Sequence, residues 1–148
     1  MILNGENVTS LLRTEETGKM ASKTSKYAAV RTKLVALQRG LAKKTDVIMD
    51  GRDIGTTVLP DAFAKIYLTA SSDARAKRRY DELKEKGENR SFDAIKEDIE
   101  KRDYEDMHRA ISPLKQADDA VLVDTPDMNI EQVVAVLSKI IDEKKAGR

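Results

Sequence analysis

One short stretch of the chain combines residue types and spacings that suit ligand chemistry: Asp50-Gly51-Arg52-Asp53, with Gly55 close behind. The apolar residues at 47–49 predict a buried strand over 47–50 that opens here into a loop. In open α/β sheets, ligands bind outside the carboxyl ends of strands. Glycine lets the backbone approach a ligand closely, arginine binds anions, and aspartate serves a metal, a sugar or a base. The stretch therefore predicts a binding loop.

A second group, Arg102, Asp106 and Arg109, lies on or beside a helix predicted from Phe92 to about His108, with Ser91 as its N-cap. Spacings of four and three residues place the three side chains on one helix face. Two interpretations are open at this point. Either the residues form a row of salt bridges along the helix, or two guanidinium groups and a carboxylate face a nucleotide. The second is chemically sound because arginine binds phosphate through two hydrogen bonds and aspartate accepts one from a ribose hydroxyl.

Two polar runs also allow either a structural or a ligand-binding interpretation. Four of the five residues at 75–79 are basic, on a helix predicted from Ser71 or Ser72 to about Lys86, and such a run is either a solvated face or a clamp for polyphosphate. The run Ser22-Lys23-Thr24-Ser25-Lys26 begins a helix predicted over 22–44. Its hydroxyl groups either cap backbone N–H groups or contact a ligand.

The composition excludes several classes of function. The 148 residues have a formal net charge of +1 with only 4% aromatic residues, which gives no reason to expect a nucleic acid or a membrane as partner. The absence of cysteine excludes disulfides, and the single histidine, His108, cannot build a zinc site. No apolar run approaches the roughly 18 residues of a membrane span, and no secretory signal is recognisable, so we expect a cytoplasmic protein.

The remaining patterns predict the elements that position these residues. Asn4-Gly5 predicts a tight hairpin, and residues 14–18 predict a helical turn closed by Gly18. Short apolar runs predict strands at 65–69 and 120–124, and the pair Asn129 and Gln132 predicts a capping box that opens a last helix. Strands that alternate with helices indicate an α/β fold with a parallel sheet.

Many short motifs occur in an order that resembles one family. They are Leu3-Asn4-Gly5-Glu6-Asn7-Val8, Arg13-Thr14-Glu15-Glu16, Ala21-Ser22-Lys23, Asp50-Gly51-Arg52-Asp53-Ile54-Gly55-Thr56, Pro60-Asp61-Ala62, Lys65-Ile66-Tyr67-Leu68, Ala76-Lys77-Arg78-Arg79-Tyr80 and Lys101-Arg102-Asp103. The chain resembles the C-terminal two-thirds of a bacterial cytidylate kinase, a nucleoside monophosphate kinase with a P-loop fold. The resemblance implies a parallel sheet flanked by helices, and phosphoryl transfer from ATP, with Mg²⁺, to CMP or dCMP.

The resemblance also implies roles for individual residues. Ser22, Arg31 and Asp53 would read the cytosine base, Arg102 and Asp106 would contact the ribose, and Arg52 and Arg109 would bind the CMP phosphate. Arg78 and Arg79, in a small lid around residues 78–109, would reach the transferred phosphoryl group. Asp50 would lie near the Mg²⁺ shell and contact the ion through water, not directly.

The sequence departs from the family because it contains no Gly-x-x-x-x-Gly-Lys-Ser/Thr loop. The family's first strand, which lies between the strands at 47–50 and 65–69, is also missing. We therefore expect an incomplete fold, with residues 1–45 as the rest of the CMP-binding subdomain and 46–148 as the core domain. Such a chain would be inactive alone, or would self-associate or depend on a complementing N-terminal chain. The alternatives are a non-catalytic CMP-binding or interaction module and one half of a split kinase.

Overall fold

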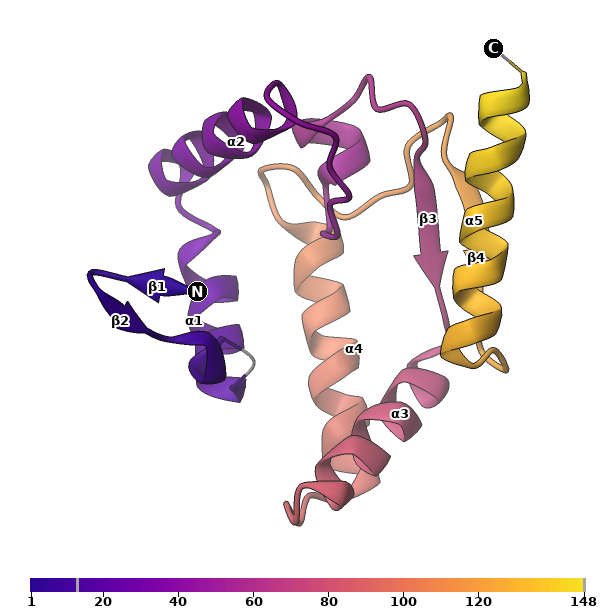
Figure 1. Ribbon diagram of the computed structural model, residues 1–148. Helices are drawn as coiled ribbons and strands as arrows, with labels where there is room; N and C mark the ends of the chain where they lie inside the picture. The colour runs from indigo at the N-terminus through magenta and orange to yellow at the C-terminus, as the bar shows by residue number, and fades with distance from the viewer. Residues whose placement is uncertain (13, 148) are drawn as a thin grey trace. The chain divides into compact units, whose positions relative to one another are not determined.

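A computed structural model describes residues 1–12 and 14–147, the side chain of Glu15 aside (Figure 1). The motif residue Arg13 lies outside the described residues. The chain divides into two compact units, Met1–Ile48 and Met49–Arg148.

The N-terminal unit begins with the predicted hairpin. Strand β1 (Ile2–Leu3) pairs antiparallel with β2 (Glu6–Asn7), so Ile2 faces Asn7 in the register. The turn residues Asn4 and Gly5 have φ of 50° and 88°. Both angles are left-handed, a conformation that asparagine and glycine tolerate best. The prediction of a tight hairpin at Asn4-Gly5 is confirmed.

The helices of this unit differ from the prediction. After the short 3-10 helix η1 (Thr9–Leu11), helix α1 (Glu15–Thr24) runs through Gly18 instead of ending there. A glycine inside a helix costs about 1 kcal/mol, which an N-cap can offset. That cap is present because the Thr14 side chain accepts a hydrogen bond from the Thr17 backbone N–H.

The prediction of a single helix over 22–44 is also wrong, because a turn at residues 25–27 separates α1 from a second helix, α2 (Ala28–Ala42). The hydroxyl groups of the polar run lie at the end of α1, not at a helix start. Thr24 Oγ1 donates to the Met20 carbonyl at 2.9 Å, and Ser25 Oγ donates to the Ser22 carbonyl at 2.9 Å. Ser25 thus supplies a donor to one of the last carbonyls of α1, which have no partner in the helix itself, whereas Thr24 bonds back to the carbonyl one turn earlier.

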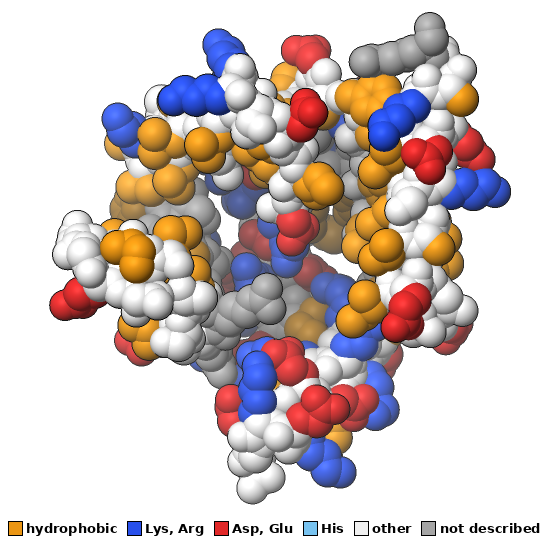
Figure 2. Space-filling view, in the orientation of Figure 1, with side chains coloured by type: hydrophobic (Ala, Val, Ile, Leu, Met, Phe, Trp, Pro, Cys, Tyr) orange, Lys and Arg blue, Asp and Glu red, His pale blue; other side chains and the backbone are white. Residues whose placement is uncertain are grey.

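Helix α2 carries a stripe of apolar side chains that is not buried. Its members are 38–58% exposed: Val30, Leu34, Leu37 and Leu41. Apolar side chains are visible along α2 in Figure 2. No side chain of α2 is buried in the described chain.

The C-terminal unit contains the parallel sheet. Strand β3 (Ile66–Thr69) pairs parallel with β4 (Val121–Asp124), with Ile66 opposite Val121. The pairing continues past the strands, since Thr125 donates to the Thr69 carbonyl through its N–H at 2.8 Å and its Oγ1 at 3.0 Å. The predictions of two strands at 65–69 and 120–124 and of a parallel sheet are confirmed.

The third predicted strand, over 47–50, is wrong. Residues 46–50 have no strand conformation, and Ile48 is 99% exposed. A strand is stabilised by a hydrogen-bonded neighbour, and within the described residues the parallel sheet consists of β3 and β4 only. Residues 46–50 therefore lead without regular secondary structure toward the π-helical turn η2 (Ile54–Val58).

A helical hairpin follows β3. Helix α3 (Ser72–Glu85) is capped by Ser71, and α4 (Phe92–His108) is capped by Ser91, as predicted. Gly87, with φ of 77°, ends the first helix, which only glycine does readily. The buried side chains Ala76, Leu83 and Ile95 form a small core between the helices, with Tyr80, Phe92 and Ile99 packed against it.

The last helix, α5 (Ile130–Ala146), begins with the predicted capping box. The Asn129 side chain accepts from the Gln132 N–H at 2.9 Å, and the Gln132 side chain accepts from the Asn129 N–H at 2.9 Å. None of the apolar side chains of this helix is buried, and Ile130 is 80% exposed. Apolar side chains are visible along α5 in Figure 2. Among the described residues, no helix has the length and apolar character of a membrane span.

Candidate functional site

The loop at 50–56 is held in shape by its own backbone. The Asp53 carbonyl accepts hydrogen bonds from the N–H groups of Thr57 at 2.8 Å and Val58 at 3.2 Å, which closes the turn η2. The two glycines of the motif lie where a side chain would crowd its surroundings. A Cβ on Gly51 would lie 2.8 Å from Ile54 Cγ1, and one on Gly55 would lie 3.2 Å from Lys65 Cδ.

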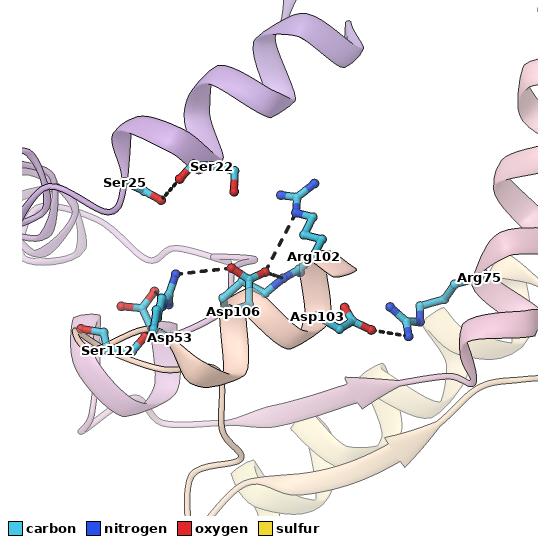
Figure 3. Close-up of polar contacts among 10 residues, drawn as sticks. Ser22, Ser25, Asp53, Arg75, Arg102, Asp103, Asp106 and Ser112 are labelled. Atoms are coloured by element: carbon cyan, nitrogen blue, oxygen red, sulfur yellow. Dashed lines mark hydrogen bonds and ion pairs between the residues drawn. The ribbon is translucent and has the colours of Figure 1, made fainter. Parts of the chain in front are cut away.

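This loop meets the end of α4 through a cluster of arginines and aspartates. The Asp106 carboxylate is the centre of the cluster, with Arg52 Nε at 3.1 Å, Arg109 Nη1 at 3.7 Å and Arg102 Nε at 4.0 Å. Arg109 Nη2 also lies 3.7 Å from Asp53 Oδ1. Figure 3 shows the Asp106 carboxylate on α4 directed toward these groups. The structure thus brings five predicted site residues together: Arg52, Asp53, Arg102, Asp106 and Arg109.

The carboxylates of this arginine–aspartate cluster are buried, whereas two of its guanidinium groups are accessible. Asp53 and Asp106 are 9% and 8% exposed, but the side chains of Arg52 and Arg102 are 42% and 52% exposed. Buried carboxylates are stable only when paired, and these are. The exposed arginines retain donors that face solvent, so the cluster can accept an anion.

Arg109 is the least accessible arginine of the cluster, with 13% of its side chain exposed. Its Nε donates to the Ser112 carbonyl at 2.5 Å, and the Leu114 N–H donates to the Asp106 carbonyl at 2.8 Å. Ser112 has φ of 49°, a left-handed conformation that turns the chain back toward α4. The loop after α4 therefore fixes the orientation of Arg109.

Next to the cluster lies a cavity of about 390 Å³ within the C-terminal unit. Its wall includes the 49–56 loop, β3, and charged side chains from several elements: Asp50, Lys65, Arg75, Arg78, Asp103 and Lys115. A volume of this size is within the range of small-molecule sites. With Arg52 and Asp53 of the loop included, the wall has five cationic side chains against three acidic ones, which favours an anionic occupant.

The two arginines predicted to reach a transferred phosphoryl group have other partners here. Arg78 Nη2 donates to the backbone carbonyl of Thr125 and lies 3.4 Å from the carbonyls of Pro126 and Met128. Arg79 Nη1 donates to Glu82 Oε2 at 2.8 Å. Lys86 and then Arg79, both hydrogen-bonded to Glu82, lower the pKa of that carboxyl group.

The other two predicted substrate residues belong to the N-terminal unit. Ser22 lies on α1, and Arg31 lies in the first turn of α2, where its N–H donates to the Tyr27 carbonyl at 3.0 Å. Ser22 is half-buried, and its backbone carbonyl accepts the hydrogen bond from Ser25.

Sequence reasoning assigned no individual role to four charged residues of the cavity wall: Lys65, Arg75, Asp103 and Lys115. Lys65, only 9% exposed, donates to the Pro60 carbonyl and pairs with Asp119 Oδ1 at 2.6 Å. Its position at the start of an apolar strand could have indicated a role for Lys65, because a cation buried beside a sheet needs a partner. Arg75 lies in a run of basic residues, so the sequence does not distinguish it from its neighbours.

The pair between Lys65 and Asp119 predicts a dependence of stability on pH. The hydrogen bond from Lys65 lowers the pKa of Asp119 from its ordinary value of 3.8. Because the pKa of Asp119 is lower in the folded state, the pair with Lys65 stabilises the fold fully at pH values above the ordinary pKa of 3.8. This stabilisation is lost as the pH falls through the folded-state pKa. We expect Asp119→Asn to lower the urea midpoint at about pH 7 and to have less effect at about pH 3.

Asp118→Asn is the matched control, because the neighbouring exposed Asp118 has no ion pair with Lys65. It should change the urea midpoint little at both pH values. An equal effect of Asp119→Asn at both pH values would contradict the role of the pair.

No group of three or more potential metal-ligating side chains occurs among the residues that the structure describes. Asp50 is exposed and lines the cavity, so it offers a single carboxylate there. Mg²⁺ in nucleotide sites is commonly held by one or two carboxylates, water and the substrate phosphates. One carboxylate therefore fits a magnesium ion that arrives with a nucleotide, not one held by the protein alone.

The amino-acid sequence is similar to those of known proteins along most of its length. The chain matches the family model described as Cytidylate kinase over residues 1–143. It is 52% identical to the cytidylate kinase of Lactobacillus johnsonii over 143 residues, which are 97% of this chain and 62% of that protein. The cytidylate kinase of Thermosipho melanesiensis is 47% identical over 142 residues, or 96% of this chain and 65% of that protein. The chain thus spans less than two thirds of the length of these relatives.

Proposed function

The chain belongs to the cytidylate kinase family, and from this premise we propose that it carries the CMP-binding part of an enzyme that phosphorylates CMP or dCMP with ATP. The observation that carries the proposal is the arginine–aspartate cluster at the loop 50–56. Three guanidinium groups surround one buried carboxylate there, and two of them keep donors exposed to solvent. Guanidinium groups bind phosphate through paired, charge-assisted hydrogen bonds.

The phosphate of CMP would bind to Arg52 and Arg109. Arg109 already lies between two carboxylates, each at 3.7 Å, so it is pre-oriented but not tightly bonded to either. A dianionic phosphate can compete for its donors because a charge-assisted bond is shorter than these separations. The carboxylates keep the arginines in place while the site is empty, which lowers the cost of ordering them on binding.

The nucleoside would be recognised by the other predicted residues. Asp106 and Arg102 would contact the ribose, and Asp53, with Ser22 and Arg31, would contact the cytosine base. Hydroxyl and carboxylate oxygens accept from the exocyclic amine of cytosine. Uracil has a carbonyl at that position, so it would leave these acceptors without a donor, which is costly in a buried site.

The reaction would be ATP + CMP → ADP + CDP, by direct transfer of the γ-phosphoryl group without a covalent enzyme intermediate. Mg²⁺ bound with ATP would neutralise phosphate charge, and Asp50 would hold it through water. To reach the transferred group, Arg78 and Arg79 must leave their partners, the carbonyls after β4 and Glu82. We therefore propose that the region around 78–109 acts as a lid that rearranges when both nucleotides are bound.

The incomplete fold is part of the proposal. The sequence has no Gly-x-x-x-x-Gly-Lys loop for the ATP phosphates. Within the described residues β3 pairs with β4 alone and residues 46–50 pair with no strand, which supports the proposal that a strand is missing. Transfer would then require a second polypeptide segment that provides both strand and loop, in the same protein or a separate chain. The alternative is a non-catalytic CMP-binding or interaction module, which the retained cluster also permits.

Calorimetric titration of the 148-residue chain with CMP, and with UMP as control, tests the proposal. We expect saturable binding of CMP and none of UMP. Turnover on addition of ATP and Mg²⁺ would show that the chain is active alone. Binding without turnover would favour the non-catalytic module or the split kinase, and turnover restored by a separate Gly-x-x-x-x-Gly-Lys segment would identify the latter. A cooperatively folded chain that binds neither nucleotide would overturn the proposal.

A further inference from the structure

Arg75 joins three elements of the C-terminal unit through one guanidinium group. It lies in the first turns of α3, and its Nε donates to the carbonyl of Ala70, directly after β3, at 3.0 Å. Its Nη2 donates to Asp103 Oδ2 on α4 at 2.6 Å. Figure 3 shows Arg75 and Asp103 facing each other across the gap between α3 and α4. Both residues line the cavity.

The part of α4 that carries Asp103 has little apolar packing on α3. The buried core between the helices consists of Ala76, Leu83 and Ile95. The last residue of α4 that packs against this core is Ile99. Arg102 and Asp106 lie beyond Ile99, and Arg109 caps the end of the helix. Polar contacts hold this second half of α4 to the rest of the unit, among them Ser72 with Glu100, Arg75 with Asp103, and Arg52 with Asp106.

We infer that Arg75 is a positioning residue for the CMP-binding side chains of α4, and that it acts through Asp103. Asp103 precedes Asp106 by three residues, so the two carboxylates project from neighbouring parts of one helix face. A bond that fixes Asp103 to α3 and to the end of β3 therefore fixes the rotation of α4 that directs Asp106 toward Arg52. The identity of the ligand, CMP, rests on the proposed function. The role of Arg75 in fixing the rotation of α4 does not.

The chemistry of the guanidinium group suits this role. Its Nε and Nη2 donors lie in one plane at a fixed separation, so two acceptors are held at a defined angle. Lysine has a single flexible ammonium group and cannot reproduce this angle. The side chain of Arg75 is 35% exposed and that of Asp103 is 22% exposed, so the pair is shielded more than the other ion pair between these helices, Lys96 with Asp73, at 32% and 62%.

The first arm of the test measures CMP affinity by calorimetry. We expect Arg75→Met and Asp103→Asn each to weaken CMP binding about 5-fold, since small misplacement of binding groups is costly. The double variant should bind no more weakly than either single variant, because the two residues act as a unit. Lys96→Met is the matched control, as it removes the other ion pair between α3 and α4, and it should leave CMP affinity within about twofold.

The second arm uses the chain without ligand and remains informative if the chain binds no CMP. The Arg52 Nε–H signal in ¹⁵N NMR spectra, assigned through its loss in Arg52→Lys, reports on the hydrogen bond to Asp106. We expect Arg75→Met and Asp103→Asn to shift or broaden this signal and Lys96→Met to leave it unchanged. A parent chain that fails to bind CMP would overturn the proposed function, whereas an unchanged Arg52 signal in both variants would overturn the positioning role.

Two further results would also overturn the inference. Additive losses in the double variant would mean that Arg75 and Asp103 act separately. A lowered melting temperature with unchanged CMP affinity and an unchanged Arg52 signal would mean that the pair only stabilises the fold. If Arg75→Met does not fold, Asp103→Asn retains the bond from Arg75 to Ala70 and tests the same coupling.

Discussion

Replacing Asp106 with asparagine should lower the free energy of unfolding by about 3 kcal/mol, at the low end of the cost of breaking a buried ion pair. The substitution keeps the size of the side chain and removes only its charge. Three guanidinium groups then lie around a neutral residue, at 3.1 Å to 4.0 Å in the parent geometry. Arg52 and Arg102 can turn to solvent, but Arg109 cannot, because its side chain is only 13% exposed. Urea denaturation of both proteins measures the difference.

Asp98→Asn is the control for this effect. Asp98 pairs with Arg90 at 2.6 Å, but its side chain is 53% exposed. Exposed ion pairs contribute little, so we expect a loss of less than about 1 kcal/mol. Similar losses in the two variants would contradict the central place of Asp106 in the cluster.

Inorganic phosphate provides a second measurement on Asp106→Asn. With the charge of Asp106 gone, the three arginines have lost the counter-charge that they share, although Asp53 still lies near Arg109, and they should take up an anion more readily. We therefore expect phosphate to raise the melting temperature of the variant more than that of the parent, since a ligand that binds only the folded state stabilises it. An equal rise in both proteins would mean that phosphate binds elsewhere.

The parts of the fold that could be predicted are those governed by local sequence. Ser71, Ser91 and Asn129 cap their helices as predicted, because an N-cap is a contact between residues two or three positions apart. The turn at Asn4-Gly5 is local for the same reason. The polar run at 22–26 was misread because serine and threonine hydroxyls serve carbonyls at the end of a helix as well as N–H groups at its start.

The errors that remain concern structure that depends on distant partners. The residues at 47–50 are apolar enough for a strand, yet a strand also needs a hydrogen-bonded neighbour, which the sequence pattern does not reveal. The spacing of Arg102, Asp106 and Arg109 predicted a common helix face. It could not predict that Arg52, fifty-four positions before Asp106, would donate to its carboxylate. Arg75 was missed because its bond to Asp103 spans twenty-eight positions.

Replacing Arg109 with methionine should weaken CMP binding by roughly 10- to 100-fold and cytidine binding much less, if Arg109 binds the phosphate. Cytidine has the same base and ribose but no phosphate, so the ratio of the two losses isolates the phosphate contact. Methionine keeps the apolar bulk of the buried side chain, and the chain around it is held by the Leu114 N–H bond to the Asp106 carbonyl, which the substitution leaves in place. Calorimetry with both ligands gives the two dissociation constants.

Arg90→Met is the matched control, because Arg90 is paired with Asp98 on α4 and lines no part of the cavity. Both of its dissociation constants should stay within about twofold of the parent values. Equal losses of CMP and cytidine in Arg109→Met would mean that Arg109 serves the fold, since a residue that only orients Asp53 and Asp106 affects the nucleoside in both ligands alike. A selective loss of CMP would identify the phosphate end of the site. The ribose would then lie toward Arg102, about two turns earlier on α4, whose side chain is 52% exposed.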